Sequence, residues 1–223
     1  MLHKMKSYLQ KNRLFIFFVC FLILYIMAFF LLEFRDVELH VVSSRWDQYI
    51  PFCEYFIVPY VSWFLYIAVT AIYFLCFCRD ERESKRYVAS FCTGMIVFIL
   101  VSLVYPNGHN LRPELEGNNI FITMVRILHR VDTPTNILPS MHVFIAVVNS
   151  VALLRQQDVR KSRLRACSIW IGSILIILST MFLKQHSVVD VVLALLLNIV
   201  CYFVFYKIDW EELGSKDVII RRI

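Results

Sequence analysis

Long runs without charged side chains constrain this chain more than any other feature of its sequence. Residues 14–32, 55–78 and 87–105 contain no Asp, Glu, Lys or Arg, and each run is at least 19 residues long. A helix needs about 20 apolar residues to cross the hydrocarbon core of a bilayer. The runs show no polar stripe of period 3.6, which excludes a soluble bundle with one wet face. They predict membrane-spanning helices.

Three weaker apolar runs follow at residues 137–154, 166–183 and 187–206. The sequence therefore predicts six spans in one all-α integral membrane domain that covers residues 1–223. The basic start of the first span resembles a signal peptide. Its apolar core of 19 residues exceeds the usual h-region, and no small-residue cleavage site follows it, so we expect a retained span.

The basic residues predict how these spans are oriented. Of the 23 Lys and Arg residues, 17 lie in four segments that share one predicted side, and 6 lie on the other. The basic segments are the N-terminus, residues 79–86, residues 155–165 and the C-terminal tail. Because cytoplasmic loops carry the excess of Lys and Arg, we expect both termini to be cytoplasmic in a protein of the plasma membrane. The net charge of +6 then predicts a bilayer as the partner and no nucleic acid.

Very few ionisable side chains remain inside the predicted spans, where they are costly and usually functional. His142 lies near the start of the fourth span and Asp190 near the start of the sixth. His186 precedes Asp190 by four residues, so a helix that covers both places them on one face. A carboxylate beside an imidazole fixes its tautomer and raises its basicity. The predicted topology brings these groups to the outer side.

The residue types at this outer side are those of a phosphate site. Arg112 offers a planar fork to phosphate, and Lys184 offers a point charge. Pro139 suits the first turn of a helix, and the backbone N–H groups after it, near Ser140, can bind an anion. One histidine as nucleophile and a second for acid–base work would complete a phosphoryl-transfer site.

Three short motifs then carry a resemblance to a known family. They are Arg112-Pro113, the tetrapeptide 139–142 (Pro-Ser-Met-His), and the segment 179–190, in which Ser179 precedes His186 and Asp190. In this order, the motifs resemble those of the type 2 phosphatidic acid phosphatase superfamily, the integral-membrane lipid phosphate phosphatases. The motifs cover about residues 100–195, and the six-span layout covers the whole chain.

The sequence departs from the family pattern at three positions. Met141 replaces the glycine of the second motif, Thr180 replaces the arginine of the third, and Tyr105 takes the basic position of the first. Lys184 and, more weakly, His109 are candidates to replace the missing cations. With these departures, the sequence resembles a branch of the superfamily that contains inositol phosphorylceramide synthase-like transferases.

The resemblance implies a mechanism and a substrate class. His186 would attack phosphorus, Asp190 would orient His186, and His142 would protonate the leaving group and then activate water. The phosphate oxygens would be held by Arg112, Lys184 and the backbone near Ser140. The scheme uses no metal and no cofactor. The implied partner is a lipid phosphate substrate: phosphatidate, phosphatidylglycerol phosphate or a polyprenyl diphosphate.

Other interpretations of the same residues stay open. An alcohol in place of water would make the chain a lipid phosphotransferase, and a site without chemistry would make it a lipid-binding or transport protein. His142, His186 and Asp190 are also a possible metal-ligand set. Residues 119–131 predict an amphipathic helix at the outer interface, with Ile120 on its apolar face, as a lid or a connector. We expect His109 to be a solvated loop residue.

Overall fold

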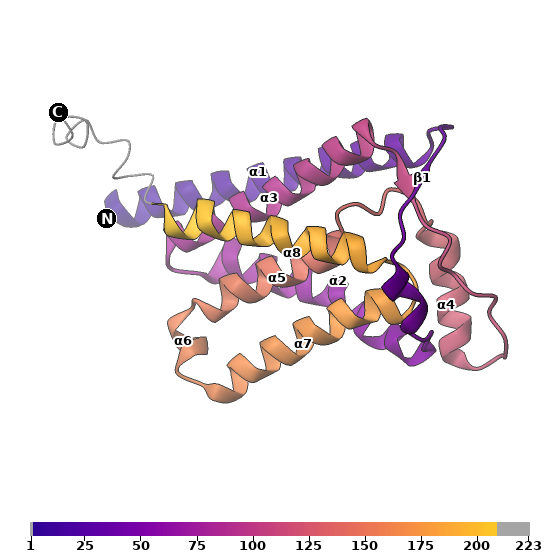
Figure 1. Ribbon diagram of the computed structural model, residues 1–223. Coiled ribbons are helices and arrows are strands. Elements are labelled where there is room, and N and C mark those ends of the chain that lie inside the picture. The colour runs from indigo at the N-terminus through magenta and orange to yellow at the C-terminus, as the bar shows by residue number, and fades with distance from the viewer. Residues whose placement is uncertain (1, 209–223) are drawn as a thin grey trace, which may run out of the picture.

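The computed structural model describes the backbone of residues 2–208 and the side chains of residues 12–208. Long helices run alongside one another over most of this part of the chain (Figure 1). Several basic residues of the orientation argument lie outside the described side chains: Lys4, Lys6, Lys11, Lys216, Arg221 and Arg222.

Five helical stretches are long and apolar enough to cross a membrane. Two of them are the α-helices α1 (Leu2–Glu33) and α3 (Glu81–Val104). A third, α7, spans Arg163–Phe182. The other two stretches each join several elements. One consists of η2 (Glu54–Phe56), α2 (Ile57–Ile72) and the π-helical η3 (Tyr73–Phe77). The other consists of α8 (Val188–Tyr202) and the π-helical η4 (Phe203–Lys207). The chain therefore has the helices of a multi-pass membrane protein.

The sixth expected span is a shorter helix than the sequence suggests. The apolar run begins at residue 137, but α5 covers only Met141–Leu154, which is about 21 Å at 1.5 Å per residue. Ser140 is its N-cap, with the hydroxyl oxygen 3.4 Å from the Val143 nitrogen. The helix therefore starts after Pro139, and the expectation that this proline lies in the first helical turn is wrong. Five spans, not six, follow from helix length.

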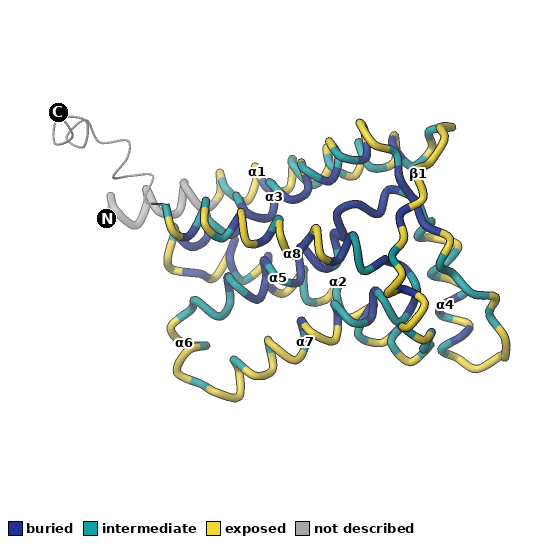
Figure 2. Tube along the Cα trace, viewed as in Figure 1, coloured by how far each residue is buried: buried dark blue, intermediate teal, exposed yellow. Residues whose placement is uncertain are grey.

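The helix α5 lies at the centre of the bundle. It packs against α2, α3, α7 and α8, and its residues are mostly buried (Figure 2). The contact with α3 requires a glycine, because a Cβ added to Gly94 would lie 1.9 Å from the Phe144 ring. A polar residue near the start of this helix is therefore enclosed by protein and not by lipid.

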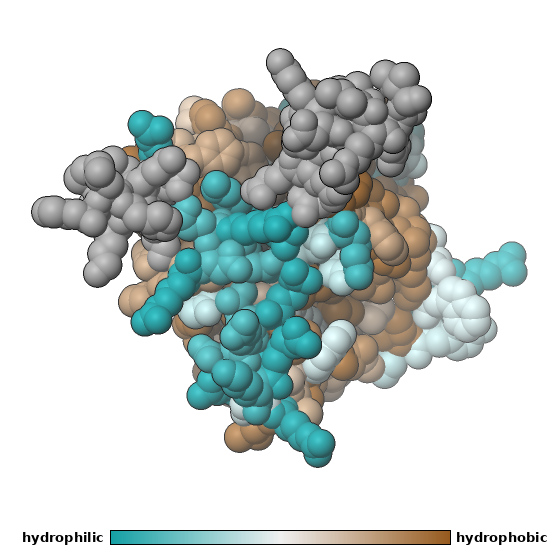
Figure 3. Space-filling model, turned by 90° about the vertical axis from the view of Figure 1, so that its left-hand side faces the viewer, coloured by the Kyte–Doolittle hydropathy of each residue, from teal (hydrophilic) through white to brown (hydrophobic). Residues whose placement is uncertain are grey.

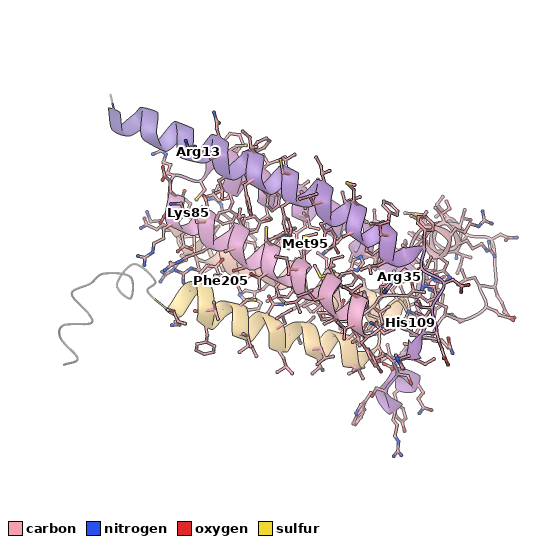
Figure 4. All side chains as sticks on the ribbon, turned by 90° about the horizontal axis from the view of Figure 1, so that it is seen from above. Arg13, Arg35, Lys85, Met95, His109 and Phe205 are labelled. Carbon is pink, nitrogen blue, oxygen red and sulfur yellow. The ribbon has the colours of Figure 1, made fainter. Side chains whose placement is uncertain are left out.

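The two ends of the bundle differ in character. Arg13 and Lys85 lie at one end, whereas Arg35 and His109 lie at the other (Figure 4). Hydrophilic side chains gather over the first end, which carries the short helix α6 (Gln157–Arg160) (Figure 3). The segregation of basic residues between two ends agrees with the charge pattern, and the sidedness in a membrane stays a prediction.

Loops at the second end are joined by strand pairing and by side-chain hydrogen bonds. The strands β1 (His40–Val41) and β2 (Asn107–Gly108) pair in parallel, with His40 opposite Asn107. The Asn107 side-chain oxygen accepts from the backbone N–H groups of Ile137 and Leu138 at 2.9 and 3.0 Å. This amide therefore fixes the segment that leads into α5.

The helix α4 (Ile120–Val131) crosses this end beside η2 and α2 (Figure 1), so the predicted amphipathic helix is confirmed. Its most buried residues are Ile122 and Val125, whereas Ile120 is 67% exposed. The short 3-10 helix η1 (Arg45–Tyr49) lies at the same end.

Candidate functional site

Three side chains that the sequence singled out form a continuous chain of hydrogen bonds. His142 Nδ1 lies 3.3 Å from His186 Nε2, and His186 Nδ1 lies 2.5 Å from the Asp190 carboxylate. Because the carboxylate only accepts, His186 carries its proton on Nδ1 and presents the Nε2 lone pair to His142. The arrangement is that of an oriented imidazole beside a second imidazole.

The starts of two helices create this arrangement. His142 is the second residue of α5, and His186 stands just before Ser187, the N-cap of α8, with Asp190 in the first turn. The Ser140 N–H donates to the Asp190 carbonyl at 3.2 Å and joins the two helix starts directly. The side chain of Ser140 is fully buried.

Aromatic side chains from α2 hold the His142 ring in place. Its centroid lies 4.6 Å from the Tyr60 ring and 4.2 Å from the Trp63 ring. The Trp63 indole N–H also donates to the His142 carbonyl at 3.0 Å, and the Tyr60 hydroxyl donates to the Asp132 carboxylate at 2.7 Å. These contacts leave the His142 ring little rotational freedom.

A cavity of about 600 Å³ ends at the two histidines. The rest of its lining is mostly apolar and aromatic side chains of α1, α2, α3 and α4. The polar lining residues are His142, His186, Gln185, Asp132, Thr133, Thr135 and Asn136. Four wall residues are substantially exposed on the outside of the bundle: Val61 (43%), Phe64 (59%), Ile127 (55%) and Val131 (79%). The apolar part of the cavity therefore reaches the surface beside residues of α2 and α4.

Arg112 lies one layer behind the polar end of the cavity. Its guanidinium donates to the Gln185 side-chain oxygen and the Asp132 carbonyl, both at 2.5 Å, and to the His129 carbonyl at 3.2 Å. Burial lowers the pKa of Arg112, but an arginine stays charged at any physiological pH. The structure thus brings this predicted phosphate ligand next to the site, with Gln185 between it and the cavity.

Lys184 is not brought to the cavity. It has a positive φ of 57°, and its ammonium donates to the carbonyls of Asp47 (2.6 Å) and Ile50. Burial lowers the pKa of Lys184. The phosphate-binding role of Lys184 stays a prediction, and its position in the structure is that of a tether to the segment around η1.

His109 is buried, so the expectation of a solvated loop residue is wrong. Only 3% of it is exposed, because the loop after α3 folds back over the bundle. Its Nε2 lies 2.9 Å from the Gln185 carbonyl, and its Nδ1 accepts from the Leu111 N–H at 3.1 Å. Burial, with His186 and Arg112 nearby, lowers the pKa of His109 to about 4. At neutral pH, His109 therefore lacks the charge of a missing cation.

The two positions at which the family pattern has a basic residue are occupied here by Thr180 and Tyr105, which have other partners. Thr180 is buried in α7, where its carbonyl accepts from the N–H groups of Gln185 and His186 at 2.9 and 3.1 Å. Tyr105 stacks on His40 with a centroid distance of 4.4 Å. Thr180 thus supports the backbone before α8, and Tyr105 packs on the loop that contains β1.

Three residues near the site were not found by sequence reasoning. Gln185 and Asp132 line the cavity, and Asp47 contacts the start of α8 from η1. Gln185 stands next to His186, which was a usable signal. Asp132 and Asp47 lie in loops, where an acidic residue is ordinary. Among the described residues, no group of three or more His, Cys, Asp or Glu side chains has the geometry of a metal site.

Comparison with known proteins yields one match. A family model described as the PAP2 superfamily matches residues 119–213, a stretch that contains His142, His186 and Asp190. No curated protein and no solved structure matches the chain.

Proposed function

From the premise that the chain belongs to the PAP2 superfamily, we propose that it is a membrane lipid phosphatase that hydrolyses a lipid phosphomonoester or diphosphate. Members of this superfamily are generally phosphatases, which supports an enzyme acting on phosphate esters. The observation that carries the proposal is the hydrogen-bonded chain from His142 through His186 to Asp190 at the end of an apolar cavity.

In the first step, the His186 Nε2 lone pair attacks phosphorus. A P–N bond forms and the P–O bond to the lipid breaks, while His142 gives its proton to the leaving alkoxide. Asp190 accepts the Nδ1–H bond throughout and stabilises the positive charge that develops on His186. The lipid leaves as an alcohol, or as a monophosphate when the substrate is a diphosphate.

In the second step, water takes the place of the leaving group. His142, now neutral, accepts a proton from this water as its oxygen attacks phosphorus. The P–N bond breaks, inorganic phosphate is released, and His186 regains its lone pair. The scheme moves protons only between His142, the lipid oxygen and water, so it needs no metal or other cofactor.

Arg112 is the cation nearest to this chemistry. We propose that an incoming phosphate replaces the Gln185 side chain as its acceptor, so that the guanidinium contacts the equatorial oxygens. The N–H groups at the start of α5, near Ser140, would complete the cradle. For Lys184, the same role requires that its ammonium leave the Asp47 and Ile50 carbonyls.

An opening beside α2 and α4 suits a lipid that stays in the bilayer. The walls of the cavity are mostly apolar and aromatic, and exposed lining residues lie on α2 and α4. A lipid would reach the histidines without its chain leaving the hydrocarbon layer. In this arrangement α5 is a sixth span enclosed by its neighbours, both termini are cytoplasmic, and the site faces the outer side of the plasma membrane.

The decisive experiment is a panel of phosphatidate, phosphatidylglycerol phosphate and a polyprenyl diphosphate, assayed with purified protein for release of inorganic phosphate. We expect release that a chelator does not affect, and an acid-labile phosphoenzyme. His186→Ala should abolish both while the protein stays folded. His40→Ala, a histidine at the same end on β1, is the matched control. Turnover by folded His186→Ala protein would remove the proposed nucleophile.

Asp132 favours a lipid phosphotransferase as a second candidate. Its carboxylate lines the cavity and accepts from the Tyr60 hydroxyl, and a carboxylate repels a phosphate but suits an alcohol. An acceptor bound there would take the phosphoryl or head group in place of water. A labelled lipid phosphate, offered with and without a polyol such as glycerol or inositol, separates the two functions by the ratio of phosphorylated acceptor to free phosphate.

A further inference from the structure

Asp47 is a buried carboxylate that the proposed mechanism does not use. It lies in η1 with only 4% of its surface exposed, far along the chain from the histidines. One carboxylate oxygen accepts from the Val188 N–H at 2.8 Å. The other accepts from the Ser187 hydroxyl at 2.7 Å and the Ser44 N–H at 2.6 Å.

Two of these three donors belong to the residues that directly follow His186. Ser187 is the N-cap of α8, and Val188 is its first residue. The first N–H groups of a helix have no partner within the helix and normally receive one from a nearby cap. Asp47 supplies that partner across 141 residues of sequence. The negative charge also suits the positive end of the helix dipole.

The local role of Asp47 does not account for this geometry. Ser44 and Asp47 form a capping box around η1. Of the three hydrogen bonds that the Asp47 carboxylate accepts, the capping box uses only the one from the Ser44 N–H. The same short segment also binds the Lys184 ammonium through the carbonyls of Asp47 and Ile50. The segment around η1 therefore forms hydrogen bonds on both sides of His186. Before His186 it binds Lys184, and after His186 it binds Ser187 and Val188.

We propose that Asp47 is a positioning residue for His186. It fixes the start of α8, and through it the position of His186 Nε2 relative to His142 Nδ1. This inference rests on the proposed function, in which His186 is the nucleophile. Without the carboxylate, the first turn of α8 loses its external cap, and a misplacement of about 1 Å at a reacting group costs as much as a hundredfold in rate.

The first test compares Asp47 variants with a buried carboxylate at the other end of the bundle. Glu83 of α3 is also buried and hydrogen-bonded, but it contacts only Arg86 and Arg155 among the ionic partners that the structure shows. For Asp47→Ala we expect a fall in kcat of roughly ten- to a hundredfold with little change in KM. Asp47→Asn should fall less, because its amide oxygen still accepts from Val188. Glu83→Gln should lose thermal stability and keep its kcat.

The second test reports on His186 without any turnover. Diethylpyrocarbonate modifies neutral imidazoles, and peptide mass spectrometry gives the rate at each histidine. Asp47→Ala should change the modification rate at His186, leave the rate at His40 unchanged, and differ in this respect from Glu83→Gln. Ser187→Ala, which removes one contact, covers the case in which Asp47→Ala does not fold. If none of the lipids is hydrolysed but His186 reactivity shifts, the proposed function fails and the positioning role stands. Unchanged His186 reactivity in folded Asp47→Ala overturns the inference.

Discussion

Each end of the bundle buries a group of ionisable side chains, and the two groups are built differently. At the end with α6, the Glu83 carboxylate accepts from Arg155 at 2.9 Å, twice, and from Arg86 at 2.6 Å. Both guanidinium groups also lie over the Tyr206 ring, at 4.8 and 5.8 Å. Opposite charges are paired, and the cavity nearest to Tyr206 measures only about 10 Å³.

The end with His142 and His186 has neither paired opposite charges of this kind nor a cavity as small. Its cavity is about 600 Å³, and its groups are two imidazoles and a carboxylate in a row. The second oxygen of Asp190 and the Nε of Arg112 are buried without a hydrogen-bond partner. The Tyr206 hydroxyl at the other end is likewise buried without a hydrogen-bond partner, so the contrast rests on the cavity and on the charge pairing. We call Glu83, Arg86 and Arg155 the closed group, and His142, His186 and Asp190 the open group. The closed group stabilises the fold, whereas the open group lies beside a cavity where a substrate can bind and react.

Removing an imidazole from the open group should have the largest effect. His142→Ala deletes the proposed acid and base, and general acid–base catalysis contributes roughly 10²- to 10⁴-fold in rate. We expect kcat to fall within that range while KM for the lipid changes little, measured as steady-state phosphate release. A folded His142→Ala protein with wild-type kcat would break the contrast between the two ends.

Removing the carboxylate from the closed group should affect stability instead. Glu83→Gln leaves two arginines without their counter-charge, and breaking a buried ion pair costs about 3–5 kcal/mol in the free energy of unfolding. We expect a lower midpoint of thermal unfolding in detergent. Because Glu83 lies at the opposite end from the histidines, kcat should stay within about twofold of wild type. A large loss of kcat at unchanged stability would contradict the distinction.

His109 predicts a pH dependence that belongs to the open end alone. Its folded pKa of about 4 lies below the value of about 6.5 in an unfolded chain, so only the unfolded state takes up the proton between these values. Stability is full above pH 6.5 and falls as the pH drops toward 4. From pH 7 to pH 5, the loss from this group is about 2 kcal/mol. His109→Gln should remove that part of the acid destabilisation, which unfolding at the two pH values will measure against His40→Gln.

Filling the cavity should have the smallest effect and should depend on the lipid chain. Val61→Trp places a larger ring in the wall near the opening, and lost apolar contacts raise KM by roughly tenfold. A short-chain phosphate should be affected less, because it does not occupy the apolar part. Leu196→Trp on the exposed face of α8 is the matched control. Equal KM values for long and short chains would argue that the lipid enters elsewhere.

Much of the fold and the centre of the site follow from the sequence. The charge-free runs predict the long helices, because no other use of such segments satisfies their backbone and their side chains. The spacing of His186 and Asp190 suggested their contact. The contact is present, although α8 begins only at Val188 and does not cover His186. The shorter extent of α5 was not predicted, because the apolar run continues through the loop at residues 137–140, and hydropathy alone does not mark a helix start.

The partners of the remaining polar residues depend on packing. Lys184 and Arg112 look alike in sequence as cations near the site, but one binds the carbonyls of a loop and the other reaches Gln185. His109 reads as a loop residue, and its burial depends on how the segments around β1 and β2 cover the bundle. Asp47 contacts residues 140 and 141 positions away, which no local pattern encodes.

The sequence by itself thus determined that this chain is a bundle of apolar helices with two histidines and a carboxylate at the helix starts, because hydrophobic length and helical period are local properties. The tertiary structure decided which charged groups form ion pairs and which lie beside a cavity. It also decided which segment forms hydrogen bonds with the residues around His186. Those outcomes arise from contacts between residues far apart in sequence, whose strength depends on burial and distance and not on residue type alone.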